Sequence, residues 1–273
     1  MDMTHDKIGA RMKAFYEQIA KTKLMRRNPV IIRIDGKAFH TFTKHLQKPF
    51  DTVLIMSMQD TMRYLCENIQ GCVLGYTQSD EISLVLIDYK RLTSEAWFDY
   101  EVQKMCSVAA SMATYAFNRA FQKYARDWED RYDRIPHPTK EQNDYLMSLH
   151  SAMDRGAMFD ARCFSIPKEE VTNMIYWRQI DAMKNSVQML ARVHFPHRRL
   201  MNKNCDEMKE MLKRKGVHWE ALPVFQQRGS CCIKTFFTRD GARRSMWIVD
   251  NSIPVFKDAD RRYIDNLIKV GEE

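Results

Sequence analysis

The order of hydrophobic segments predicts an α+β protein built on a ferredoxin-like, split βαβ antiparallel sheet. Three observations support that fold class. A β-branched run at 29–34 precedes a segment of helical periodicity at 52–70. Two apolar runs, 72–77 and 82–87, are joined by a polar tetrapeptide, as in a β-hairpin. A second helix, a strand and a third helix then follow. We expect helices on one face of the sheet and the end of the first strand beside the hairpin tip.

The flanking segments are assigned by the same patterns. Met12, Phe15 and Ile19 recur at helical spacing and predict a helix before the first strand. Pro136 and Pro138 interrupt a long polar stretch, which predicts an insertion or mobile loop. In chain order, the later segments are a helix at 97–126, the insertion at about 127–158, a strand at 159–166 and a helix at 169–192.

Two regions are expected from this reading. Residues 1–193 would form the main domain, which carries the sheet and the insertion. Residues 194–273 are basic and would form a small α/β extension packed on it. That extension contains a helix near 206–215, a hairpin near 230–249 and a short C-terminal helix.

Composition limits the functional classes. The chain has 273 residues and a formal net charge of +8, which favours polyanionic partners such as nucleic acid. No apolar run approaches the roughly 18 residues that a membrane span needs, so no membrane partner is expected. Seven irregularly spaced cysteines and an N-terminus without an apolar core fit reduced thiols and a cytoplasmic protein.

Two acidic pairs form the sharpest local pattern. Asp35-Gly36 ends the first strand, and Asp80-Glu81 lies at the hairpin tip. Converging carboxylates repel one another unless a cation lies between them, and Mg²⁺ prefers such oxygen ligands. The alternative is that both pairs are ordinary turn residues, because turns favour the same residue types. A zinc site is disfavoured, since the cysteines and histidines show no CxxC spacing.

Four segments, in order, resemble the signatures of the tRNA-His guanylyltransferase family. The first is Arg33-Ile34-Asp35-Gly36-Lys37-Ala38-Phe39-His40, which continues through Lys48-Pro49-Phe50-Asp51. The others are Tyr76-Thr77-Gln78-Ser79-Asp80-Glu81, Phe159-Asp160-Ala161-Arg162 and Trp177-Arg178-Gln179-Ile180-Asp181. The resemblance runs from about residue 23 to residue 267, apart from the insertion.

The resemblance implies a polymerase-type palm, two Mg²⁺ ions, ATP and GTP or other NTPs as substrates, and nucleotide addition in the 3′-to-5′ direction. Matched motif by motif, the catalytic, metal-binding carboxylates would be Asp35, Asp80 and Glu81, assisted by the Gly36 carbonyl. Positive groups are needed around the triphosphate. The implied nucleotide-binding residues are Lys37, Ala38, Phe39, His40, Lys48 and Ser79, and Lys104 on the long helix is a further candidate.

One motif departs from the eukaryotic pattern. Enzymes that add G−1 to tRNA-His read His-Ile-Asn-Asn after the fourth signature, whereas this chain reads Met183-Lys184-Asn185-Ser186. This version resembles the bacterial and archaeal guanylyltransferase-like branch, which repairs truncated tRNA 5′-ends on a template. We therefore predict template-dependent 5′-end repair in preference to G−1 addition.

Basic residues, several of them near aromatics, and one asparagine of the fourth motif supply candidate RNA contacts, although each is also compatible with a solvated surface. They are Arg178, Lys184, Asn185, His197, Arg198, Arg199, Lys203 and Arg228. The resemblance further implies tRNA as partner and a homo-oligomer, a tetramer.

Two alternative functions remain open. One is a signalling cyclase on the same palm, which the hairpin Gln78-Ser79-Asp80-Glu81 disfavours. The other is a non-catalytic RNA-binding protein.

Overall fold

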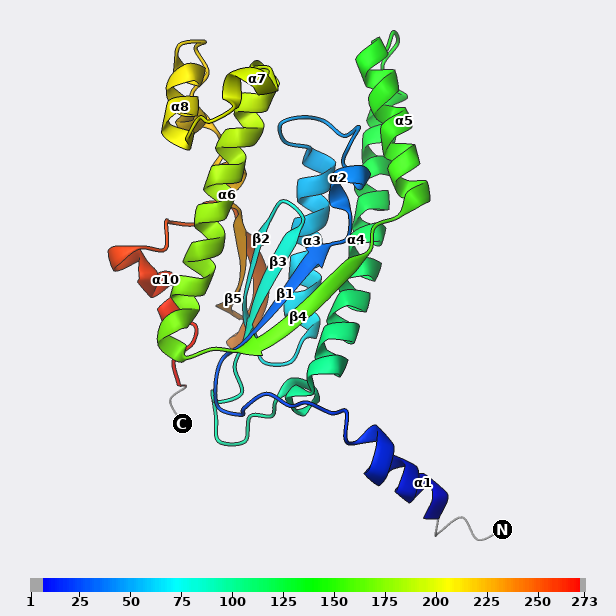
Figure 1. Ribbon diagram of the computed structural model, residues 1–273, viewed down its shortest axis with the longest axis vertical. Helices are drawn as coiled ribbons and strands as arrows, with labels where there is room; N and C mark the ends of the chain where they lie inside the picture. Colours follow the sequence, from blue (N-terminus) through cyan, green and yellow to red (C-terminus); the bar gives the residue numbers. More distant parts are fainter. Residues whose placement is uncertain (1–6, 271–273) are drawn as a thin grey trace.

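A six-stranded antiparallel sheet forms the centre of the molecule in the computed structural model, which describes residues 7–270. The strand order is β4-β1-β3-β2-β5-β6, so the first strand and the hairpin strand β3 lie side by side (Figure 1). The strands are β1 (Val30–Gly36), β2 (Cys72–Gln78), β3 (Glu81–Leu86), β4 (Phe159–Ser165), β5 (Ser230–Arg239) and β6 (Ala242–Asp250). The predicted fold class, a palm-type antiparallel sheet with helices, is confirmed.

Helices cover both faces of this sheet, whereas the sequence pattern predicts them on one. Alternate residues of β1 point to opposite faces. Ile32 and Ile34 pack in a core with helices α3 (Thr52–Asn68) and α4 (Val102–Tyr132). Ile31 instead packs in a second core with α6 (Val171–His194) and α10 (Arg262–Asp265). The central strands are therefore buried on both sides, which explains their nearly continuous apolar sequence.

The predicted insertion is helical, so its description as a polar mobile loop is wrong. Helix α4 continues to Tyr132, and α5 (Lys140–Arg155) returns antiparallel to it (Figure 1). A capping box between Thr139 and Gln142 starts α5. Its buried residues Tyr145, Leu149 and Ala152 follow helical spacing. The two prolines lie in the turn between the helices, where they break no helical hydrogen bond.

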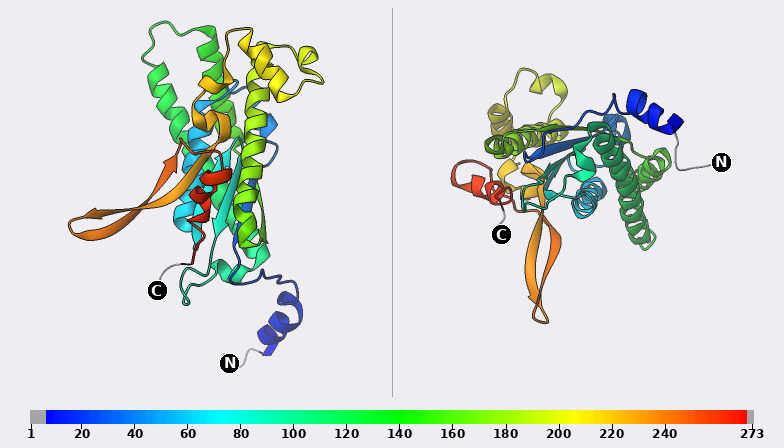
Figure 2. Two further views of the ribbon diagram at one scale, coloured as in Figure 1. Left: turned by 90° about the vertical axis from the view of Figure 1, so that its left-hand side faces the viewer. Right: turned by 90° about the horizontal axis from the view of Figure 1, so that it is seen from below.

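The chain after residue 193 adds two strands to the same sheet, because β5 pairs with β2. Strands β5 and β6 then extend beyond the body as an arm (Figure 2, orange). Short helices cover the rest of this region: α7 (His197–Leu200), α8 (Cys205–Lys213) and α9 (Val224–Arg228). A third core joins α6 to α8 around Leu190, Leu212 and Trp219.

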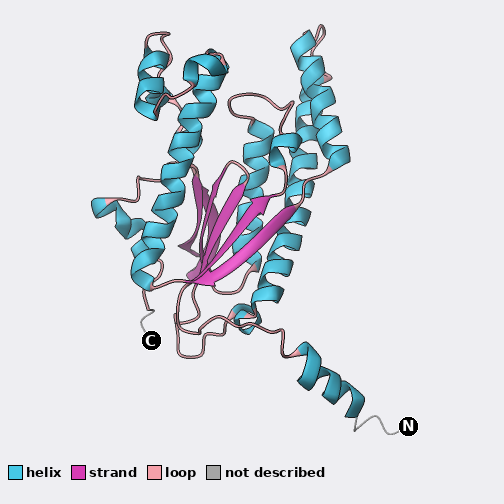
Figure 3. Cartoon of the chain, in the orientation of Figure 1, coloured by secondary structure: helices cyan, strands magenta, loops and turns pink. Residues whose placement is uncertain are grey.

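The remaining helical segments are short. Helix α2 (Phe39–Phe42) follows β1, and α1 (Lys7–Met12) with the π-turn Lys13–Glu17 projects from the body near the N-terminus (Figures 1 and 3). The 3₁₀ turns are Trp97–Tyr100, Lys168–Glu170, Trp219–Ala221 and Asp258–Arg261. Among residues 7–270, no helix is long and apolar enough to cross a membrane. All seven cysteines are free thiols.

Candidate active site

The end of β1 and the β2–β3 turn bring the predicted carboxylates to one edge of the sheet. Asp35 lies directly opposite Glu81 of β3, so these two side chains share a face. The backbone N–H of Gly36 donates to the carbonyl of Asp80 at 3.1 Å, which ties the strand end to the turn. The predicted juxtaposition of Asp35-Gly36 with Asp80-Glu81 is therefore present in the structure.

The β2–β3 turn has a strained residue at its tip. Ser79 has a left-handed φ of 54°, and its hydroxyl donates to Oδ1 of Asp80 at 2.9 Å. A left-handed conformation is uncommon for serine, and such residues concentrate at functional sites. Ser79 thus orients the Asp80 carboxylate, as its position before the acidic pair predicts.

Burial and mutual repulsion raise the pKa values of two of the carboxyls. The pKa of Asp35 is raised first by burial and then by the negative charges of Asp80, Glu81 and Asp160, while Arg162 acts in the opposite direction. Burial also raises the pKa of Asp80, against a lowering hydrogen bond from Ser79. Two half-buried carboxylates that disfavour their own charge form a suitable environment for a cation.

Glu81 differs from its two neighbours because both of its carboxylate oxygens are already bonded. Oε1 accepts a hydrogen bond from Nε of Arg33 at 2.9 Å, and Oε2 accepts one from Nη2 of Arg178. Arg178 also donates to Asp181 at 2.7 Å. Both guanidinium groups also lie over the ring of Trp177. The Cζ atom of Arg33 is 5.4 Å from the ring centroid, and that of Arg178 is 4.7 Å from it. Glu81 is thus anchored to α6, a role that its prediction as a metal ligand does not include.

Sequence reasoning missed several members of this cluster. Arg33 and Asp181 are named above only within motifs, yet both complete the charge network around Glu81. Asp160 lies opposite Asp35 on β4, and Arg162 is 4.0 Å from the Asp35 carboxylate. The sequence of β4 could have indicated them, because its side chains alternate between the two faces of the sheet. Asp160 and Arg162 fall on the same face as Asp35 once the strand order is known.

The donor set fits Mg²⁺, which combines a few protein oxygens with water and substrate phosphates. The fitting residues are Asp35, Asp80 and the Gly36 backbone. A Cβ on Gly36 would lie 2.2 Å from the ring of Phe39, so only glycine fits there. Among the described residues, no group of three or more His, Cys, Asp or Glu side chains is arranged to hold a metal. A metal at this edge would therefore depend on substrate oxygens as well.

The predicted nucleotide-binding residues fall into two groups. Lys37 and His40 are exposed just after β1, and Ala38 has a left-handed φ of 53° that turns the chain into α2. Phe39, by contrast, is buried against Phe42, Phe117 and Phe159, so its side chain packs in the core. The apolar ring explains that placement.

A cavity adjoins the β2–β3 turn. Ser79 and Gln78 line it from the sheet, and Lys48 lines it from the loop at 43–51. Lys48 donates to the carbonyl of Thr43 at 3.1 Å while remaining exposed. Apolar lining comes from Met189 of α6 and Phe225 of α9. This hollow, about 100 Å³ in volume, has a lysine and a turn hydroxyl at its rim and could form only one part of a nucleotide site.

Lys104 is not brought to this site. It lies in the first turn of α4, where its ammonium is 4.6 Å from the Phe98 ring centroid. Farther along the same helix, the hydroxyl of Thr114 accepts a hydrogen bond from the backbone N–H of Phe159, next to the sheet edge. Ten residues of helix separate the two positions, or about 15 Å. Within one chain, Lys104 is remote from Asp35.

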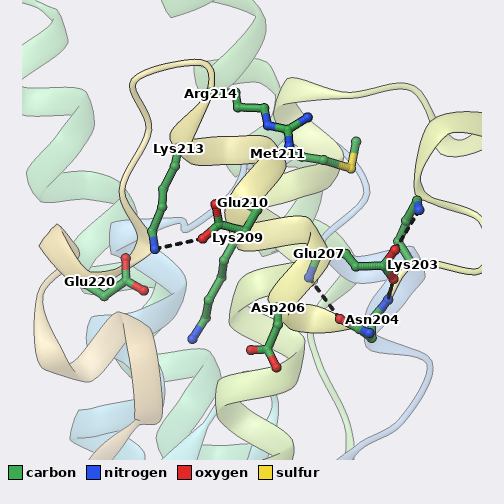
Figure 4. A pocket seen from close by; sticks show the side chains of 10 residues that line it. All are labelled: Lys203, Asn204, Asp206, Glu207, Lys209, Glu210, Met211, Lys213, Arg214 and Glu220. Atoms are coloured by element: carbon green, nitrogen blue, oxygen red, sulfur yellow. Dashed lines mark hydrogen bonds and ion pairs between the residues drawn. The ribbon is translucent and has the colours of Figure 1, made fainter.

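The predicted RNA contacts are also placed unequally. Lys184, Asn185 and the His197–Arg199 segment are exposed on α6 and α7. Lys203 is ion-paired with Glu207 in the hollow along α8, where Lys213 similarly pairs with Glu210 (Figure 4). Arg178 is directed inward to Glu81, and Arg228 donates to the carbonyl of Ile253 at 2.9 Å. These two arginines thus make internal contacts instead of forming an open basic surface.

Comparison with known proteins identifies the lineage. A family model described as tRNAHis guanylyltransferase matches residues 9–167, more than half of the chain. The chain belongs to the tRNAHis guanylyltransferase family. The predictions of this family and of a nucleotidyltransferase are thereby confirmed at the family level.

Solved structures extend the likeness to nearly the whole chain. A bacterial tRNA(His) guanylyltransferase-like protein in complex with ATP is 39% identical, with a TM-score of 0.78 over 97% of this chain and 100% of that one. A bacterial guanylyltransferase-like structure in complex with GTP is 38% identical, with a TM-score of 0.76 and the same coverage. The α4–α5 hairpin therefore belongs to a fold shared almost from end to end.

Curated relatives are more distant. An uncharacterized protein of Acanthamoeba polyphaga mimivirus is 26% identical over 98% of this chain and 90% of its own length. The tRNA(His) guanylyltransferase of Schizosaccharomyces pombe is 30% identical over 63% of this chain. That match spans 55% of the yeast protein, so the similarity to this guanylyltransferase covers about half of its length.

Proposed function

We propose that this chain adds nucleotides to the 5′-end of tRNA or a tRNA-like RNA in the 3′-to-5′ direction, directed by the opposite strand, as 5′-end repair. The observation that carries the proposal is the convergence of Asp35 and Asp80 at one sheet edge, beside a cavity lined by Lys48 and Ser79. The solved relatives in complex with ATP and with GTP support nucleoside triphosphates as substrates.

In this proposal the 5′-phosphate of the RNA first attacks the α-phosphorus of a nucleoside triphosphate and releases pyrophosphate. The 3′-hydroxyl of the incoming nucleotide then attacks the activated 5′-phosphorus of the RNA, loses its proton and displaces the nucleoside monophosphate. Asp35, Asp80 and the Gly36 carbonyl would hold two Mg²⁺ ions. Bound there, Mg²⁺ supplies positive charge that activates the attacking oxygen and stabilises the leaving one.

The protein groups position the substrates. Lys48 and Lys37 offer positive charge to the triphosphate, which is the main requirement in phosphoryl transfer. The anchored Glu81 fixes the first residue of β3, and so holds the neighbouring Asp80 at the turn. Met189 and Phe225 present apolar surface suited to a base.

Repair is favoured over G−1 addition by the segment after Asp181. Lys184 and Asn185 are exposed on α6 about two turns beyond Arg178, which contacts Glu81. Met183 replaces the histidine of the eukaryotic pattern, and the charge of the adjacent Lys184 suits a phosphate backbone better than recognition of one base.

The test uses a tRNA that carries a 5′-monophosphate and lacks its first nucleotide. With ATP, Mg²⁺ and each NTP in turn, we expect extension only by the NTP complementary to the opposite strand. Asp80→Asn should slow this extension about 100-fold or more, as expected for loss of a group acting on the transferring phosphate. Asp144→Asn, on the exposed face of α5, is the matched control and should leave the rate unchanged.

Other outcomes would redirect the assignment. Addition of G alone, restricted to tRNA-His, would replace repair by G−1 addition. RNA binding with no extension of any end, or extension that survives Asp80→Asn, would contradict the catalytic site.

We also propose that the active form is a homotetramer, as the family resemblance implies. Exposed apolar side chains support self-association, since Ile8, Phe15, Tyr16 and Ile19 are 64–77% exposed along the N-terminal helical segment. Sedimentation velocity under assay conditions should give a species of four chains. Monomers alone in an active sample would refute this.

A further inference from the structure

The α4–α5 hairpin contacts the loop that carries Lys48. The Tyr145 hydroxyl of α5 donates to Oδ2 of Asp51 at 2.7 Å, and both residues are buried. At the other end of α5, Nη1 of Arg155 donates to the carbonyl of Thr41 at 2.8 Å. The hairpin is therefore fastened to the segment between β1 and α3 at two points.

Asp51 is the junction of that loop. Its Oδ1 accepts the backbone N–H of Leu54 at 2.8 Å and so caps helix α3. Its Oδ2 accepts the backbone N–H of Gln47 at 3.0 Å, which closes the turn that contains Lys48. Tyr145 supplies the third hydrogen bond to the same carboxylate. A shift of Asp51 would consequently move both the turn and the start of α3.

Tyr145 is itself held rigidly. Its ring packs edge-on against Trp128 of α4, with centroids 4.9 Å apart and an interplanar angle of 87°. Burial and the Asp51 charge keep the pKa of Tyr145 well above its ordinary value, so the hydroxyl stays protonated and can donate. The donor is thus fixed in both position and protonation state.

The loop that Asp51 holds is one wall of the cavity beside Asp80. Gln47, Lys48 and Pro49 line it opposite Ser79. Within residues 7–270, Lys48 bonds only to Thr43 of its own loop, so the position of its ammonium depends on the conformation of residues 43–51. Because this loop is already ordered before the nucleotide binds, binding does not carry the entropic cost of ordering it.

We propose that Tyr145 is a positioning residue for the nucleotide: through Asp51 it holds the 43–51 loop in its binding conformation. This inference rests on the proposed function. It gives the helical hairpin a role in substrate affinity, although the hairpin lines none of that cavity itself.

The hairpin supplies a matched control. Tyr132 also contacts Trp128, here in a stacked arrangement with centroids 5.6 Å apart, and its hydroxyl bonds the side chain of Asn143. This second tyrosine lies at the hairpin turn, and its hydroxyl bonds only within the hairpin in the part of the chain that the structure describes. Tyr145→Phe and Tyr132→Phe therefore remove the same atom from one hairpin, the first at a buried carboxylate and the second at a more exposed amide, but only the first disconnects the Lys48 loop.

The experiment measures GTP addition to a tRNA that carries a 5′-triphosphate and faces an unpaired C in the template. We expect Tyr145→Phe to raise KM for GTP about tenfold, the usual effect of one hydrogen bond to a charged group, with kcat within twofold. Tyr132→Phe should match the wild type in both. Equal kinetics for the two variants, or a parallel fall of kcat and thermal stability in Tyr145→Phe, would overturn the proposal.

A double-mutant cycle tests the route through Asp51. Asn is an acceptable N-cap, so Asp51→Asn should retain α3 while weakening the turn. If Tyr145 acts through Asp51, Tyr145→Phe adds less than twofold to KM in the Asp51→Asn background. Fully multiplicative effects would contradict that route.

Equilibrium binding of ATP to the same variants separates the two proposals, because a wild type that binds ATP but adds no nucleotide refutes only the proposed function.

Discussion

At the scale of single residues, three adjacent carboxylates occupy three environments. Glu81 is neutralised by two arginines, Asp35 has a raised pKa and only the distant Arg162 at 4.0 Å, and Asp80 has a raised pKa with no arginine partner among the described residues. Position in the strand explains the difference. Glu81 begins β3 and reaches α6, while Asp80 lies in the turn, where arginine contacts are lacking among the described side chains.

The weakly compensated charge at Asp35 predicts a conflict between stability and activity. Its folded-state pKa lies above its unfolded value, so the ionised form destabilises the fold at neutral pH. We expect Asp35→Asn to abolish nucleotide addition and yet raise the melting temperature by roughly 1–3 °C at pH 7 without Mg²⁺. Thermal unfolding followed by circular dichroism measures the shift.

The pH dependence gives the sign of this effect. Below the unfolded pKa of about 3.9, Asp35 is protonated in both states and the variants should converge. As the pH rises through the folded pKa, the wild type loses stability relative to Asp35→Asn. Mg²⁺ should stabilise the wild type and leave the variant unaffected. A less stable Asp35→Asn at pH 7 would contradict the electrostatic account.

At the scale of elements, the strands and the site edge were the most predictable part. Short β-branched runs have few alternatives, and the order strand, helix, hairpin, helix, strand places the first strand next to the hairpin. Asp35 and Glu81 are consequently paired as expected. The exact register, and with it Asp160 opposite Asp35, required the strand pairs themselves.

Helix α5 was missed because polarity outweighed periodicity. Only Tyr145, Leu149 and Ala152 are buried on it, and the two prolines before it favoured a loop. The burial of the Phe39 side chain was missed for a related reason, since its motif predicts a nucleotide site while its ring packs in the core. In both cases the deciding contacts join residues far apart in sequence, such as Tyr145 with Asp51, which no local pattern encodes.

At the scale of the whole molecule, the net charge of +8 does not show which basic residues meet RNA. Exposure and pairing separate them. Arg198 and Arg199 are exposed on α7 with no ion pair among the described residues, whereas Lys203 and Lys213 on the neighbouring α8 segment are paired with glutamates. A lysine already neutralised by a carboxylate displaces fewer counterions from a phosphate than an unpaired arginine does.

This distinction predicts the salt dependence of tRNA binding. The dissociation constant should rise at least tenfold between 50 and 200 mM salt, and the joint change of Arg198 and Arg199 to Ala should lower the slope of log K against log salt by about 2. Lys213→Ala, close by but paired with Glu210, should change the slope by less than half as much per residue. Fluorescence anisotropy with labelled tRNA measures the slope for the wild type, the double variant and Lys213→Ala.

Equal slopes for the wild type and the double variant would exclude α7 from the RNA interface. The affinity for ATP should be the same in all three proteins, because α7 lies outside the nucleotide cavity.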